Sequence, residues 1–77
     1  MHQAEFFAKI EEILDSQPGS ISAESVVQDQ DGWDSVAALS LIAVIDESYG
    51  VSLEGTEIIR CPTVGDLFAL VQQRKQP

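Results

Sequence analysis

The sequence predicts an all-α fold, a bundle of three main helices plus one short helix, with a long first loop. Apolar residues recur every three or four positions in three segments, and each segment is long enough for several helical turns. Residue types that favour helix starts and helix ends flank these segments. The chain has 77 residues, which is one domain at most, so residues 1–77 are expected to pack around a single core.

The first helix is expected over residues 3–15. Five apolar side chains fall at helical spacing there: Phe6, Phe7, Ile10, Ile13 and Leu14. Charged residues, among them Lys9, Glu11 and Glu12, are expected on the opposite, polar side. The run SQPGS at residues 16–20 combines proline and glycine, which ends the helix.

Residues 16–33 show no strong periodicity and are expected to form the long loop. Three of its apolar residues, Ile21, Val26 and Val27, are expected to attach parts of it to the core. A long ordered loop is uncommon in so small a domain and is often functional.

The second helix is expected over residues 35–49. Asp34 suits the N-cap, and Gly50 suits a left-handed residue at the C-terminus. Apolar residues lie on every side of this helix, which is typical of a buried helix. A bundle this small cannot bury every side of one helix, so the end nearest Ser35 should face solvent or a partner.

A short helix is expected over residues 55–60 and a last helix over residues 63–74. Thr63 and Asp66 resemble a capping box with aspartate in the position of glutamate. The expected core of the whole domain is Phe7, Ile10, Leu14, Leu39, Ile42, Ile45, Tyr49, Ile59, Val64, Leu67, Phe68 and Val71.

The charge pattern restricts the classes of partner. The net charge is -9, and there is no Lys or Arg between Lys9 and Arg60. Such a surface repels phosphate backbones, which argues against nucleic-acid binding. It attracts basic partner surfaces. The alternative is that the acidic residues only keep a small domain soluble.

The cysteine content and the hydropathy indicate the compartment. Cys61 is the single cysteine, so an internal disulfide is excluded and a reducing, cytoplasmic location is expected. Charge interrupts the N-terminal segment too early for a signal peptide. No apolar run approaches the ~20 residues needed to cross a bilayer. We expect a monomer, with Cys61 as a small core residue.

Ser35 is the candidate functional residue. A helix N-terminus presents unpaired N–H groups and the positive end of the helix dipole, so a phosphate ester on Ser35 would be well placed. The alternative is that Asp34 and Ser35 only cap the helix. Hydrolase chemistry is not expected at Ser35, because the only histidine, His2, lies at the chain terminus.

The stretch DQDGWD at residues 29–34 hints at a calcium loop but does not fit one. With Gly32 at the sixth position of an EF-hand loop, Val27 and Ala38 would occupy the first and last ligand positions. We therefore expect no metal site. Trp33 either folds onto the core as a loop anchor or stands exposed beside Ser35.

Three short motifs together resemble the acyl carrier protein family. They are DSV at Asp34–Val36, IDESYGV at Ile45–Val51 and TVGD at Thr63–Asp66. DSV alone is a weak signal, whereas the three motifs at this spacing, length and charge are specific. The resemblance is densest from Asp31 to Val71 and is compatible with the rest of the chain.

The resemblance implies a carrier and not an enzyme. In this family a separate phosphopantetheinyl transferase moves phosphopantetheine from coenzyme A onto the motif serine, which is Ser35 here. The terminal thiol of that arm then holds an acyl group as a thioester between enzymes. The partners implied are this transferase and acyl-loading and acyl-transferring enzymes with basic or apolar docking patches. The positions implied for partner recognition are Asp34, Val36, Leu41, Ala43, Asp46 and Glu47.

Departures from the family pattern favour a specialised carrier. Ala37, Ala38 and Ser40 stand where carriers for bulk fatty-acid synthesis have more acidic residues, and Trp33 is also unlike those carriers. The sparser charge predicts partners that recognise the helix more through apolar contact than through ion pairs. Two alternatives remain open: a D-alanyl or other aminoacyl carrier, and an unmodified carrier-like interaction domain.

Overall fold

The computed structural model describes residues 2–75 and is all-α, as predicted. The helices are α1 (Gln3–Leu14), α2 (Ser35–Tyr49), the short α3 (Gly55–Ile59) and α4 (Val64–Arg74). One turn of 3-10 helix, η1 (Val27–Asp29), lies within the long loop between α1 and α2. No strand occurs among the described residues, where pairing is limited to an isolated bridge between Val26 and Thr63.

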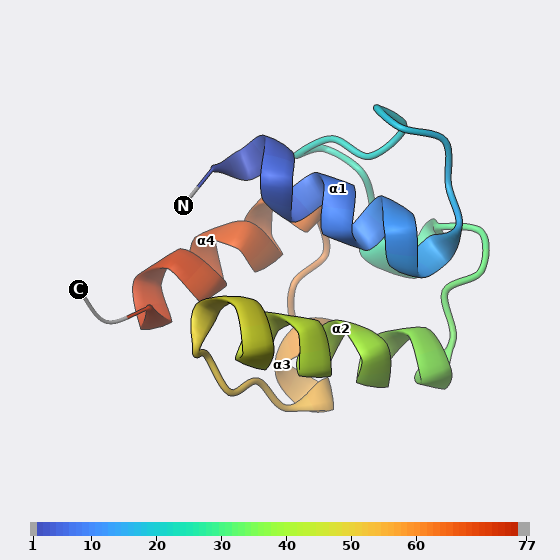
Figure 1. The fold of residues 1–77 in the computed structure, drawn as a ribbon. Helices are drawn as coiled ribbons and strands as arrows, with labels where there is room; N and C mark the ends of the chain where they lie inside the picture. The colour runs from blue at the N-terminus through green and yellow to red at the C-terminus, as the bar shows by residue number, and fades with distance from the viewer. Residues whose placement is uncertain (1, 76–77) are drawn as a thin grey trace.

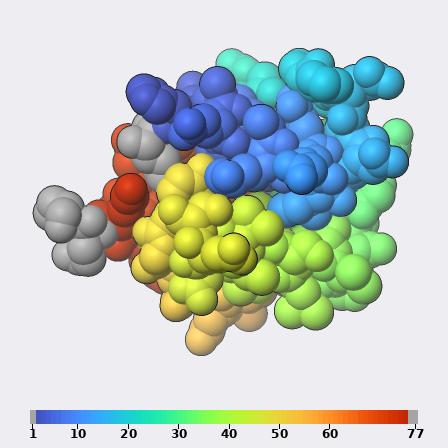
Figure 2. Space-filling model, viewed as in Figure 1, coloured from blue at the N-terminus to red at the C-terminus, as the bar shows by residue number. Residues whose placement is uncertain are grey.

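The four helices form a bundle in which α1 and α2 run antiparallel (Figure 1). The short α3 lies behind α2, and α4 lies beside the start of α1 and the end of α2. The start of α2 is at the opposite end of the molecule from the start of α1 and the end of α4. The space-filling view shows the outer side of α2 as open surface (Figure 2).

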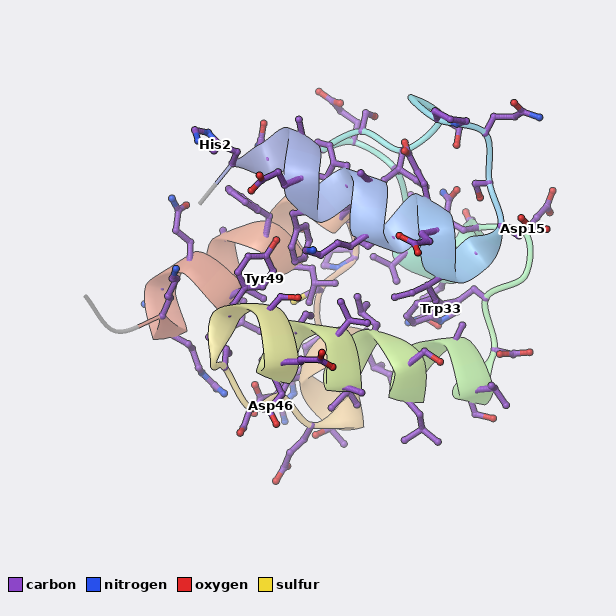
Figure 3. All side chains as sticks on the ribbon, in the orientation of Figure 1. His2, Asp15, Trp33, Asp46 and Tyr49 are labelled. Carbon is purple, nitrogen blue, oxygen red and sulfur yellow. The ribbon has the colours of Figure 1, made fainter. Side chains whose placement is uncertain are left out.

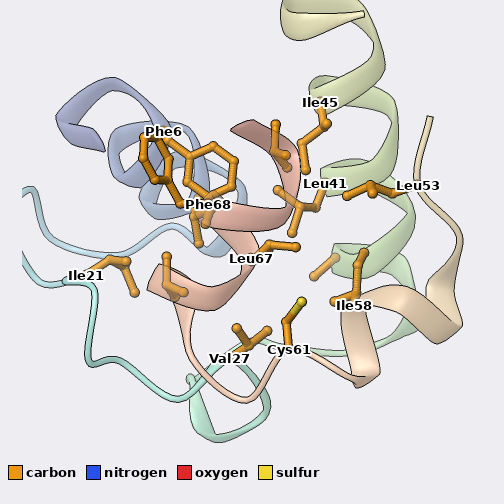
Figure 4. Packing of buried hydrophobic residues seen from close by; sticks show 14 of the residues in the cluster. Phe6, Ile21, Val27, Leu41, Ile45, Leu53, Ile58, Cys61, Leu67 and Phe68 are labelled. Atoms are coloured by element: carbon orange, nitrogen blue, oxygen red, sulfur yellow. The ribbon is translucent and has the colours of Figure 1, made fainter. Parts of the chain in front are cut away.

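The core draws side chains from all four helices, which converge on one another in Figure 4. The largest side chains that are almost fully buried are Phe6, Leu41, Ile45, Ile58, Val64, Leu67 and Val71. Phe6 packs edge-on against Phe68, with ring centroids 5.4 Å apart. The buried cluster also contains Val51 and Leu53, which lie in the segment that joins α2 to α3.

The predicted core is correct for Ile10, Leu14, Ile45, Val64, Leu67, Phe68 and Val71, which are all buried. Phe7, Ile42 and Tyr49 are half-buried and pack against the cluster. Two predictions are wrong: Leu39 is 66% exposed and Ile59 is 69% exposed. Helix α2 instead buries Ala37, Leu41 and Ile45. Because α2 has apolar residues on every side, its sequence does not specify which side packs inward.

Glu11 anchors the long loop to α1 from inside the fold. Its side chain is buried, and its Oε2 accepts backbone hydrogen bonds from Gly19 at 2.9 Å and Ile21 at 3.0 Å. The prediction that Glu11 lies on the polar side of the helix is therefore wrong. A buried carboxylate needs such partners, because an unpaired one would lose its hydration without compensation.

The second half of the loop pairs with the start of α4. The N–H groups of Val64 and Gly65 donate to the carbonyls of Ser25 (2.8 Å) and Ala23 (2.9 Å). A Cβ at Gly65 would lie 2.8 Å from that carbonyl oxygen of Ala23, so glycine permits this approach. Ile21 and Val27 are buried as expected, but Val26 is 40% exposed, because its backbone pairs here and its side chain does not.

Candidate functional site

A tight turn connects the long loop to α2. The N–H of Trp33 donates to the carbonyl of Gln30 at 3.1 Å, and Gly32 between them has φ +85°. That conformation is strained for residues with a side chain, so glycine is suited to this position. Asp34 then caps the helix, and its Oδ1 accepts the N–H of Ala37 at 2.8 Å. The predicted roles of Asp34 as N-cap and of Gly50 as left-handed C-terminus are confirmed.

Ser35 is the first residue of α2 and is exposed. The side chain of Asp34 accepts a hydrogen bond from the N–H of Ala37. The backbone carbonyl of Asp34 accepts one from the N–H of Ala38 at 3.0 Å. The N–H groups of Ser35 and Val36 have no such partner among the described residues. No acidic residue lies in the first turn itself. The start of α2 can therefore stabilise a negative charge on the Ser35 side chain through free N–H groups and the helix dipole.

An apolar groove of about 610 Å³ opens beside Ser35, between α2 and α3. Ten residues line it: Gln28, Trp33, Asp34, Ser35, Ala38, Leu39, Ile42, Gly55, Ile58 and Ile59. Trp33 is half-buried and packs against the core while it lines the groove, and it points inward near the start of α2 (Figure 3). Of the two expectations for Trp33, the structure agrees with the loop anchor and adds contact with the groove.

The residues expected to contact partners fall into two groups. Asp34, Val36, Ala43, Asp46 and Glu47 are exposed on α2 or at its start. Leu41 is 1% exposed and belongs to the core, so the expectation of a direct surface contact there is wrong. Leu41 lies four residues before Ile45, so both are on the side of α2 that packs into the core.

Two residues near Ser35 were expected in the core and lie at the surface: Leu39 and Ile59. For Leu39 the sequence does contain a usable signal. Leu39 and Asp46 are seven residues apart, which places them on the same side of a helix. Because Asp46 is charged, that side is the one expected to face water. No equivalent signal exists for Ile59 in the short α3.

Cys61 is buried in the core, as expected. Burial raises the pKa of its thiol, and the nearby carboxylates of Asp66 and Glu57 raise this pKa further. A thiol that resists ionisation is a poor nucleophile.

Residues 2–75 contain no cluster of three or more His, Cys, Asp or Glu side chains that could hold a metal ion. Within the same residues, no helix has the length and hydropathy to span a membrane.

Comparison with known proteins identifies the family of the chain. The family model described as "Phosphopantetheine attachment site" matches residues 5–71. An acyl carrier protein MbtL from a Mycobacterium species is 37% identical over 54 residues, which cover 70% of this chain and 61% of that protein. The chain thus spans less than two thirds of this relative's length. An acyl carrier protein MbtL from Mycolicibacterium paratuberculosis is 32% identical over 68 residues, which cover 88% of this chain and 76% of that one.

A solved structure shares the fold. The solution structure of a holo acyl carrier protein from Geobacter metallireducens superposes with a TM-score of 0.76 at 24% identity. The match covers 96% of this chain and 86% of that one.

The chain belongs to the phosphopantetheine attachment-site family and, within it, to the acyl carrier proteins. Its prosthetic group is phosphopantetheine, attached covalently. The start of α2 fits that group. An exposed hydroxyl, two free backbone N–H groups and an apolar groove lie together there.

Proposed function

We propose that Ser35 carries the phosphopantetheine group and that the chain presents an apolar acyl group, held as a thioester, to successive enzymes. The single observation that carries this proposal is the placement of Ser35, exposed at the first position of α2 and on the rim of the groove. When bound, phosphopantetheine supplies a flexible arm that ends in the thiol which forms the thioester. The free N–H groups at the start of α2 stabilise the phosphate on Ser35.

The proposal assigns no catalysis to the chain itself. Modification of Ser35 requires a base that takes the proton from its hydroxyl. The only histidine of the chain, His2, lies at the start of α1, at the other end of the molecule from Trp33 and the start of α2 (Figure 3). The proposal assigns this base to the transferase, and the contribution of the carrier is a high effective concentration of its tethered cargo.

The lining of the groove supports an apolar acyl cargo over an aminoacyl one. Leu39, Ile42, Ile58 and Ile59 give the groove apolar walls next to Ser35. An alkyl chain that leaves water for such walls gains about 0.8 kcal/mol per buried CH₂. An alanyl group carries a charged amine, which gains nothing from these walls.

The proposal also includes a cytoplasmic location, which a free Cys61 favours.

Intact mass spectrometry tests the attachment. The purified chain is incubated with coenzyme A and a broad-specificity phosphopantetheinyl transferase, alongside Ser35→Ala and Ser48→Ala. Ser48 is a second exposed serine on the same helix. The wild type and Ser48→Ala should gain one phosphopantetheine unit, and Ser35→Ala none. If the transferase modifies a control carrier but not this chain, the interaction-domain alternative is favoured.

A comparison of loaded forms tests the cargo. The transferase is supplied with octanoyl or alanyl coenzyme A, so that the arm arrives already acylated. Octanoyl loading should raise the melting temperature and change the fluorescence of Trp33, the only tryptophan, because Trp33 lines the groove. Equal effects of the two groups on both measurements would contradict the apolar-cargo proposal.

A further inference from the structure

Gly55 differs from the other four glycines of the chain, because the backbone gives no reason for a glycine there. Gly19, Gly32 and Gly50 have φ between +69° and +85°, which favours glycine. Gly65 approaches a backbone carbonyl too closely for a Cβ. Gly55 has no positive φ, and a Cβ added to it would meet no described atom within 4 Å. Alanine would make this helix more stable, so the reason for glycine lies outside the stability of α3.

Gly55 lies at the edge of the groove beside Ser35. It is the first residue of α3, is exposed and lines the groove. Ile58 and Ile59 follow by three and four residues, so all three residues share one side of α3, and all three line the groove. Ile58 is 1% exposed and lies among the buried side chains (Figure 4), whereas Ile59 is 69% exposed. The missing side chain of Gly55 therefore leaves a gap in the wall that α3 contributes.

The gap adds width to the groove and not length. The opposite wall belongs to α2 and consists of Ala38, Leu39 and Ile42. An acyl chain carried on Ser35 lies between this wall and that of α3, and a gap in one wall gives room to the side of the chain. A straight alkyl chain needs only the width of its CH₂ groups, whereas a branch or a ring needs more.

We infer that Gly55 is a specificity-determining residue that lets the groove hold acyl groups with a branch or a ring, an inference that rests on the proposed function. The straight part of such a group lies between Leu39 and Ile58, and its wider part lies over Gly55. The groove is lined mainly by apolar side chains, so the wider part also gains from leaving water. A larger side chain in place of Gly55 would fill the gap and still leave room for a straight chain.

The test compares two acyl groups with the same number of carbon atoms, the straight octanoyl group and the ring-bearing phenylacetyl group. The transferase loads each group from its coenzyme A ester onto the wild type, Gly55→Leu and Thr56→Leu. Thr56 is exposed and follows Gly55 in α3 but does not line the groove, so Thr56→Leu is the matched control. The melting temperature of each loaded form is compared with that of the same variant carrying the unacylated arm.

Both acyl groups should raise the melting temperature of the wild type by a few degrees. Gly55→Leu should lose about half or more of the rise caused by phenylacetyl and keep most of the rise caused by octanoyl, because leucine fills only the gap. Thr56→Leu should keep both rises. The fluorescence change of Trp33 should follow the same pattern, since Trp33 lines the same groove.

Gly55→Ala tests whether the fold itself needs this glycine. With the unacylated arm, this variant should melt at the wild-type temperature or above it, because the added Cβ meets no described atom within 4 Å.

Five results would overturn the inference while octanoyl still stabilises the wild type. They are a wild type that phenylacetyl does not stabilise, no loss in Gly55→Leu, an equal loss for both acyl groups in Gly55→Leu, the same loss in Thr56→Leu, and a lower melting temperature in Gly55→Ala. A wild type that is not modified, or that octanoyl does not stabilise, would instead overturn the proposed function, and this inference with it.

Discussion

Truncation of two leucines on α2 tests which side of this helix faces the core. Leu41 is 1% exposed and lies among Phe6, Ile45 and Leu67 in the buried cluster, whereas Leu39 is 66% exposed. Leu41→Ala removes buried methyl groups and leaves a cavity, which costs about 2–5 kcal/mol. Leu39→Ala removes groups that mostly contact water, so its cost should stay within about 0.5 kcal/mol.

These magnitudes are large compared with the stability of a small domain. A domain of this length is stable by about 4–12 kcal/mol. Leu41→Ala should therefore lower the melting temperature by about 8–40 °C, at about 4–8 °C per kcal/mol. Leu39→Ala should shift it by only a few degrees. The two variants make the same chemical change on the same helix, so helix propensity cancels in the comparison.

Urea denaturation followed by far-UV circular dichroism measures both free energies of unfolding. The slope with urea concentration should be the same for the wild type and both variants, because the same surface unfolds in each. If Leu39→Ala costs as much as Leu41→Ala or more, α2 does not pack with Leu41 inward and Leu39 outward. The groove beside Ser35 would then be wrong too.

Three further predictions concern the thiol, pH and salt. Native apo protein should react slowly with a thiol reagent because Cys61 is buried, and modification by the transferase should add one fast-reacting thiol. Fast labelling of the apo form would show that Cys61 is accessible. Stability should fall between about pH 8 and pH 11, because the pKa values of Cys61 and Tyr49 are raised in the folded state and the unfolded chain loses these protons first. The fall should be smaller in Cys61→Ala, and an equal fall would exclude this cause. Added salt should raise the melting temperature, since it screens the repulsion behind the net charge of -9. An unchanged melting temperature between low and moderate salt would contradict that explanation.

The helices, their ends and the candidate residue follow from the amino-acid sequence alone. The caps at Asp34 and Thr63 and the left-handed Gly50 were all predicted, and the structure contains each of them. These features depend on residues a few positions apart, and local hydrogen bonds and backbone preferences suffice to specify them. The motif around Ser35 is local in the same sense.

The buried side of α2 and the anchoring of the long loop depend instead on tertiary packing. Leu39 and Leu41 are the same residue type two positions apart, and only the packing of α2 into the core makes one a surface residue and the other a core residue. Its place in the sequence suggests that Glu11 is a solvated charge, whereas in the structure its side chain accepts hydrogen bonds from the backbone of the loop. Both outcomes depend on contacts between segments distant in sequence, and periodicity cannot encode these when a helix is apolar on every side.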